Sequence, residues 1–193
     1  MKYNSFEIYD GINRIMFSAP HAVEQLREGQ IKGFEPHTGM LVEALVNQGC
    51  CGIIKTANDN DDANYDPVNP YKDELKRFID GKGVRVLFDI HELAPEREMD
   101  VCIGTGLGAN LCGRGDIVEL VKECFLEQGI DRITVDEPFA AAYENTVSAF
   151  VARECQIPAI QIELNCSMFF EERDMFDAVL NALGSLANRC EEL

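Results

Sequence analysis

Basic residues are scarce in this sequence, and acidic residues are abundant. Seventeen lysines and arginines stand against 34 aspartates and glutamates, which gives a formal net charge of −17 at pH 7. A surface of this charge repels phosphate backbones and offers no basic stripe, which argues against nucleic-acid binding. We therefore expect no nucleic-acid partner.

Long apolar runs and targeting signals are also missing. No stretch approaches the roughly 18 residues of a membrane span, and the opening MKYNSFEIYD lacks a basic start followed by an apolar core. We expect no membrane partner, no signal peptide and a cytoplasmic location. Because no segment has the composition of a linker and no repeat is visible, residues 1–193 are expected to form a single domain.

A Cys-x-x-Cys pair is absent although the chain has eight cysteines. This argues against a zinc ribbon or a redox dithiol. Several cysteines lie in apolar surroundings such as VKECFLE, where a reduced cysteine behaves as a small core residue. A thiol enzyme using Cys112 or Cys166 is a remote alternative, because neither has an adjacent histidine in the sequence.

What is present is an alternation of apolar runs and helical periods, which is typical of an α/β domain. Runs such as VRVLFDI and PAIQIEL are nearly continuously apolar, as expected of strands in a mostly parallel sheet with helices on both faces. The predicted strands are 14–19, 52–56, 84–90, 101–104, 132–135 and 158–164. The predicted helices are about 37–48, 70–80, 115–128, 143–155 and 171–190.

Polar residues close three of the apolar strands. His21 follows the first strand and Glu24 comes three residues later, His91 closes the run 84–90, and Glu163 interrupts the last strand. Such sheets bind their ligands beyond the carboxyl ends of the strands. The three strand ends are therefore the candidate site.

These residue types suit a metal ion. Two imidazoles and a carboxylate make the three-ligand set of a catalytic zinc, whose fourth position takes a water of lowered pKa. His21, Glu24 and His91 would be the ligands, with Glu163 as a further carboxylate that moves the proton. The alternative is a set of ordinary strand-end polar residues, and the spacing alone does not decide between the two.

The same segments resemble the N-formylglutamate amidohydrolase family, relatives of the zinc carboxypeptidases. The similar segments are SAPHAVEQ, DIHE, IGTGLGAN and the stretch DEPFAAAYENTVSAFVARECQIPAIQIELN, in that order between about residues 15 and 170. The resemblance implies a phosphorylase/hydrolase-like fold and a hydrolase of amide bonds. It also implies one Zn²⁺ per chain, or another divalent metal, and a small N-acyl amino acid or peptide as substrate.

The resemblance also gives the four residues roles, with His21, Glu24 and His91 at the metal-ligand positions and Glu163 at that of the general base. Asp89, two residues before His91, either orients its imidazole or caps a neighbouring loop.

In the long polar loop, DDANYD stands where the family has Asp-x-Asn-Arg. Asn64 keeps the asparagine, but a tyrosine replaces the arginine that would bind a substrate carboxylate. Arg27 or Arg114 could substitute for it, or either could be a surface arginine. This departure makes N-formylglutamate itself a doubtful substrate.

Two other classes of protein stay open. The chain could be a non-catalytic metal- or ligand-binding relative. It could also be a nucleotide-binding enzyme that uses the glycine loop around Gly104, Gly106 and Gly108, although this spacing fits neither the dinucleotide fingerprint nor a P-loop. His37 is expected to be structural.

Overall fold

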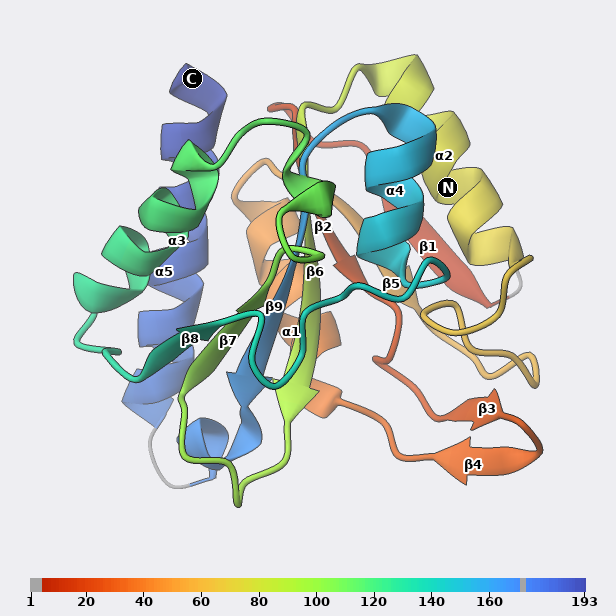
Figure 1. Cartoon of the computed structure of the whole chain (residues 1–193), viewed down its shortest axis with the longest axis horizontal. Coiled ribbons are helices and arrows are strands. Elements are labelled where there is room, and N and C mark those ends of the chain that lie inside the picture. Colours follow the sequence, from red (N-terminus) through yellow and green to blue (C-terminus); the bar gives the residue numbers. More distant parts are fainter. Residues whose placement is uncertain (1–4, 171–172) are drawn as a thin grey trace.

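The computed structural model describes residues 5–170 and 173–193. Its centre is a seven-stranded sheet with strand order β1-β5-β2-β6-β9-β7-β8, and a separate hairpin, β3–β4, projects from it (Figure 1). The sheet strands are β1 (Phe6–Tyr9), β2 (Ile15–Ala19), β5 (Cys51–Lys55), β6 (Val86–Leu93), β7 (Val101–Gly104), β8 (Ile133–Val135) and β9 (Ala159–Asn165). The hairpin strands are β3 (Gln25–Arg27) and β4 (Gln30–Lys32).

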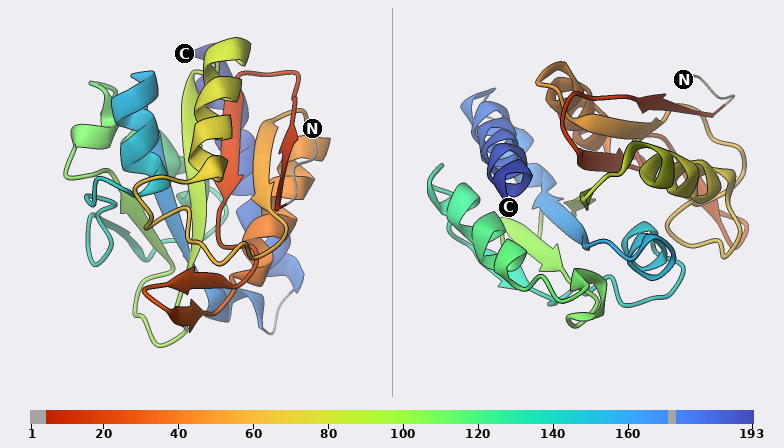
Figure 2. Two further views of the ribbon diagram at one scale, coloured as in Figure 1. Left: turned by 90° about the vertical axis from the view of Figure 1, so that its right-hand side faces the viewer. Right: turned by 90° about the horizontal axis from the view of Figure 1, so that it is seen from above.

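Helices cover both faces of the sheet, as Figure 2 shows from above. They are α1 (Pro36–Asn47), α2 (Pro70–Lys82), α3 (Asp116–Leu126), α4 (Val147–Cys155) and α5 (Arg173–Glu192), with short 3₁₀ helices η1 (Ala109–Leu111) and η2 (Cys166–Phe169). Helices α1, α3 and α5 pack on one apolar cluster, and α2 and α4 pack on another across the sheet. Burial on both faces explains the nearly continuous apolar character of β6 and β9.

The sheet is mixed. The pairs β2–β5, β2–β6, β6–β9 and β7–β8 are parallel, whereas β1 pairs with β5, and β7 with β9, in antiparallel fashion. This confirms the predicted fold class. Because β2, β6 and β9 are neighbours that run in one direction, their carboxyl ends meet at one edge of the sheet.

The predicted strands and helices are all found; the strand 101–104 has the predicted bounds, and the other elements have shifted ends. Helix α4 starts at Val147 rather than near 143, because the Thr146 side chain accepts a hydrogen bond from the backbone N–H of Ala149 and so fixes the N-terminus. Strand β1 and the β3–β4 hairpin were not predicted. Residues 171 and 172, where the predicted last helix begins, lie outside the described residues.

None of the helices in the described ranges combines the length and the apolar character that crossing a membrane requires.

Candidate metal centre

The carboxyl ends of β2, β6 and β9 bring the strand-end residues together. His21 lies two residues beyond β2, and His91 and Glu163 lie within β6 and β9. In the parallel register of β6 and β9, His91 is the direct partner of Glu163. Side chains of paired residues point to the same face of a sheet, so these two groups stand side by side.

Glu35 completes the cluster through a closed excursion of the chain. After His21 the chain leaves the sheet, forms the β3–β4 hairpin and returns, and the backbone N–H of Glu35 donates to the carbonyl of His21 at 2.8 Å. Pro36 then begins α1, at the helix position that proline favours. Glu35 stands at the N-cap position, but its side chain does not cap the helix. It turns to the histidines instead.

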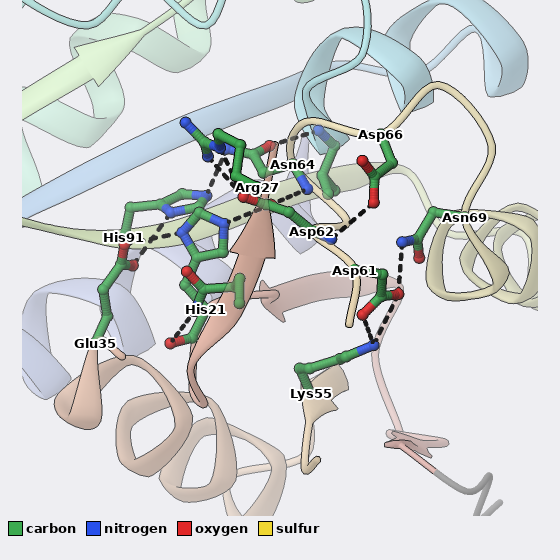
Figure 3. Close-up of polar contacts among 12 residues, drawn as sticks. His21, Arg27, Glu35, Lys55, Asp61, Asp62, Asn64, Asp66, Asn69 and His91 are labelled. Atoms are coloured by element: carbon green, nitrogen blue, oxygen red, sulfur yellow. Dashed lines mark hydrogen bonds and ion pairs between the residues drawn. The ribbon is translucent and has the colours of Figure 1, made fainter. Parts of the chain in front are cut away.

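His21, Glu35 and His91 each offer a ligand atom within 4.8 Å of the other two. The Glu35 carboxylate bridges the rings, with Oε1 at 2.9 Å from His21 Nδ1 and Oε2 at 3.2 Å from His91 Nδ1. Figure 3 shows the two rings converging on this side chain. Both histidines are almost fully buried. Two imidazole nitrogens and one carboxylate oxygen around one point match the donor set of a zinc site with three protein ligands.

Each histidine is held from behind by a second carboxylate. His21 Nε2 lies 2.9 Å from Asp62 Oδ1, and His91 Nε2 lies 3.2 Å from Asp89 Oδ2. A carboxylate only accepts, so both Nε2 atoms must carry the hydrogen, which leaves the Nδ1 atoms for a cation. Carboxylate–histidine pairs of this kind fix the ring orientation and tautomer of metal ligands. The structure thus places Asp89 behind His91.

The charges in the cluster shift its pKa values strongly. Burial alone would lower the pKa of His21, but the charge of Glu35 and the hydrogen bonds to Asp62 and Glu35 outweigh it and raise that pKa to about 9. The pKa of His91 is raised well above its ordinary value, because Asp89 and Glu35 outweigh the effect of burial. The histidines outweigh burial at Glu35 and lower its pKa to about 2. The cluster therefore attracts positive charge, which protons or a metal cation can supply.

Glu163 lies beside the cluster and differs from the other carboxylates. Burial raises its pKa to about 7; the charge of His91 opposes this shift, and that of Glu35 adds to it. One oxygen accepts a hydrogen bond from Gln161 Nε2 at 2.8 Å. The residue is 8% exposed. A carboxyl that titrates near neutrality suits general acid–base chemistry.

Asn64 and Arg27 lie next to the cluster. Asn64 Oδ1 accepts from the backbone N–H of Val147 at 2.7 Å, which fixes the amide orientation and turns Nδ2 toward His91. Nδ2 and the protonated Nε2 of His91 are both donors, so their 3.4 Å contact leaves the amide N–H without an acceptor there. Arg27 donates from Nε to Asp62 at 2.8 Å, and its guanidinium lies 4.9 Å from the centre of the Tyr65 ring.

The structure corrects two of the sequence expectations. Glu24 is exposed and is not a member of the cluster, because the chain bends at residues 22–23 and the next residue, Gln25 at the start of β3, is the buried one. Arg114 pairs with Asp116 at the opposite edge of the sheet, since β7 runs antiparallel to β9 and carries the chain away from the site. Neither residue belongs to the cluster of His21, Glu35 and His91.

The glycine loop lies at that same distant edge. It is filled by its own side chains: the amide of Asn110 packs against Gly106 and donates to the carbonyl of Ala141 at 3.0 Å. The described structure gives no support to a phosphate cradle there. His37 lies near the cluster, stacked on Phe169 and bonded through its backbone N–H to Glu92 at 2.7 Å.

Sequence reasoning missed Glu35 and Asp62. Glu35 lies 14 residues beyond His21, and the only sequence signal for it is a glutamate directly before the proline that starts a helix. Asp62 belongs to the loop motif DDANYD, which drew attention to its asparagine and tyrosine only. Both residues reach the site by loop closure, which periodicity does not encode.

Fold and site together define an α/β domain with a candidate metal centre at the strand ends. No protein-family model matches the sequence, and comparison with curated proteins finds no match. Solved structures do match. N-formylglutamate amidohydrolase from Ralstonia eutropha JMP134 superposes with a TM-score of 0.71 at 15% identity, over 98% of both chains.

Two further solved structures share the fold. A bacteriophage poly-gamma-glutamate hydrolase has a TM-score of 0.62 at 12% identity and covers 98% of this chain and 92% of its own. A metallo-carboxypeptidase from Burkholderia cenocepacia has a TM-score of 0.57 at 12% identity and covers 91% of this chain and 57% of its own. The resemblance seen in the sequence motifs is thereby confirmed at the level of the fold.

Proposed function

We propose that this protein is a zinc-dependent hydrolase of an amide bond in a small N-acyl amino acid or peptide. The observation that carries the proposal is the convergence of His21, Glu35 and His91 within 4.8 Å of one another, with Glu163 as the strand partner of His91. The shared fold of an amidohydrolase and a metallo-carboxypeptidase supports it.

The metal would be held by His21 Nδ1, His91 Nδ1 and a Glu35 oxygen, a ligand set in which Glu35 replaces Glu24. Asp62 and Asp89 would orient the two imidazoles and keep the hydrogen of each ring on Nε2, so that Nδ1 is unprotonated and can bind the metal. Imidazole with carboxylate suits zinc, although other divalent metals share this preference. When bound, such an ion lowers the pKa of water toward 7 and polarises a carbonyl group.

Glu163 would act as the general base. Its carboxylate takes a proton from the attacking water and passes it to the nitrogen of the leaving amine, so the group ends the cycle as it began. Gln161 holds one oxygen, which leaves the other for the water. Because the base must be ionised, kcat/KM should rise as the pH is raised through the pKa of Glu163, which is about 7. A nearby divalent cation favours the ionised form and would lower this pKa.

Asn64 and Arg27 would bind the substrate. The Asn64 amide N–H, fixed by the contact of its oxygen with α4, can donate to the oxygen that gains negative charge during attack. Arg27 uses Nε and one terminal nitrogen on Asp62, so the remaining edge of its guanidinium can donate to a single substrate carboxylate.

The test is elemental analysis of protein purified without added metal, together with matched variants. We expect about one zinc per chain in the wild type, little in His21→Ala and Glu35→Ala, and full occupancy in Glu24→Ala, because Glu24 is exposed. Glu163→Gln should keep the metal and lose at least about 10²-fold in kcat/KM against an N-acyl amino acid.

Glu24→Ala is the control for Glu35→Ala, because both remove one carboxylate from the same excursion. A metal-free wild type with full hydrolytic activity would contradict the proposal, as would a Glu163→Gln variant as active as the wild type.

A further inference from the structure

The site is crowded with negative charge. Two carboxylates stand behind the histidines, one lies between them and one lies at their side; they are Asp62, Asp89, Glu35 and Glu163. A divalent cation and the guanidinium of Arg27 together carry one positive charge fewer than these four groups carry negative.

Among the described residues, the surroundings of Arg27 add more acid, and the cations nearby are either already paired or exposed to solvent. Glu28 accepts a hydrogen bond from the Tyr65 hydroxyl, and the charges of Glu28 and Asp66 both act on that phenol. Arg27 therefore pairs with the carboxylate of Asp62 and lies against Tyr65, whose hydroxyl is bonded to a second carboxylate, that of Glu28. Its one free edge is enough for one substrate carboxylate but not for two.

The two buried lysines near this loop are already used. Lys72 is 1% exposed, and its ammonium donates to the backbone carbonyls of Asp66 and Asn145 at 2.6 and 2.7 Å. Lys55 is 3% exposed and pairs with Asp61 at 2.8 Å. Neither can turn to a ligand without leaving buried polar groups unpaired. Lys32 and Arg97 are exposed, and solvated charges of this kind contribute little to holding an anion.

We propose that the substrate is an N-acyl amino acid whose side chain is neutral or basic, and that a side-chain carboxylate is rejected. This inference rests on the proposed function and narrows it. An α-carboxylate has a partner in Arg27, whereas a second carboxylate would meet an acidic site in a protein of net charge −17. Like charges placed together in this way select against the wrong ligand.

The experiment compares N-formylglutamine with N-formylglutamate, which have the same shape and differ in one charge. Their dissociation constants are measured by calorimetry on zinc-loaded Glu163→Gln protein, which binds without turnover and keeps the carboxylates of Asp62 and Glu28 around Arg27 and Tyr65. We expect the glutamine compound to bind at least about tenfold more tightly. Added NaCl should tighten binding of the glutamate compound and leave that of the glutamine compound nearly unchanged, because salt screens repulsion.

Tyr65→Arg and Tyr65→Gln provide a matched pair. The first adds a guanidinium beside Arg27, and the second removes the ring without adding charge. Tyr65→Arg should improve the binding of N-formylglutamate relative to N-formylglutamine, and Tyr65→Gln should not.

Equal or tighter binding of the glutamate compound to the Glu163→Gln protein with Tyr65 intact, or no binding of the glutamine compound, would overturn the proposal. Selective binding of the glutamine compound without its hydrolysis by the zinc-loaded wild type would support the charge selection and contradict the catalytic proposal instead.

Discussion

At the scale of single residues, His21 and His91 each lie between two carboxylates. This position determines their protonation and leaves Nδ1 of each ring as the atom that could bind a cation. The inner carboxylate, that of Glu35, is shared, while Asp62 and Asp89 each serve one ring. Without a metal each of the four ring nitrogens has a carboxylate to which it can donate, so both rings hold two protons below their raised pKa values. A cation held by His21, Glu35 and His91 would replace the Nδ1 protons and leave the Nε2 protons on Asp62 and Asp89.

This arrangement predicts that zinc affinity rises with pH. The pKa of His21 is about 9 and that of His91 is also raised, so below these values zinc must displace a proton from each Nδ1. Glu35, with a pKa of about 2, is ionised throughout and adds no dependence. We expect the association constant to increase by about tenfold to a hundredfold per pH unit between pH 6 and 8, measured by competition with a chelator of known affinity. A zinc association constant that does not change with pH would contradict the conclusion that each histidine is protonated between two carboxylates.

At the scale of elements, the β3–β4 hairpin and the loop before α2 behave as one unit. The backbone N–H of Leu26 donates to the carbonyl of Asp61, Arg27 pairs with Asp62, and Tyr65 bonds to Glu28 at the hairpin turn. Lys72 then ties the same loop to the segment that precedes α4. The side chains that border the metal centre are thereby fixed by contacts between separate elements.

Asn64 has two functions in this unit, and they can be separated. Asn64→Ala removes the acceptor for the Val147 N–H at the start of α4, which should cost about 1 kcal/mol in the free energy of unfolding, together with activity. Asn64→Asp keeps the acceptor but loses the amide N–H. Denaturant unfolding should therefore give nearly wild-type stability for Asn64→Asp, while kcat/KM falls about 10²-fold. An Asn64→Asp variant with wild-type kcat/KM would argue against the donor function.

The elements were more predictable from the sequence than the site. Continuous apolar runs located β6 and β9, and the residues that close them, His91 and Glu163, were found because a buried strand leaves few places for polar groups. Glu35 was not found, because its position depends on a backbone hydrogen bond to His21 across the hairpin excursion. Short-range spacing favoured Glu24 instead, because it lies only three residues after His21.

At the scale of the whole molecule, the charge of −17 opposes the compact state. The carboxylates repel one another over distances comparable to the Debye length, which falls from about 30 Å at 0.01 M salt to about 8 Å at 0.15 M. We expect the melting temperature of the metal-free protein to rise by a few degrees when NaCl is raised from 10 to 150 mM. Calorimetry in the presence of a chelator measures this, and an unchanged melting temperature would show that self-repulsion contributes little.

The bond between the Glu35 N–H and the His21 carbonyl has a consequence for how this fold diversifies. It joins the chain on both sides of residues 22–34, so a segment that keeps the contacts with the loop before α2 can differ in sequence or length while His21 and Glu35, the proposed ligands, stay in place. Arg27 lies in that exchangeable segment, whereas His91 and Glu163 belong to the sheet. Grafting a hairpin from another member of the fold should therefore alter the choice of substrate and preserve the chemistry.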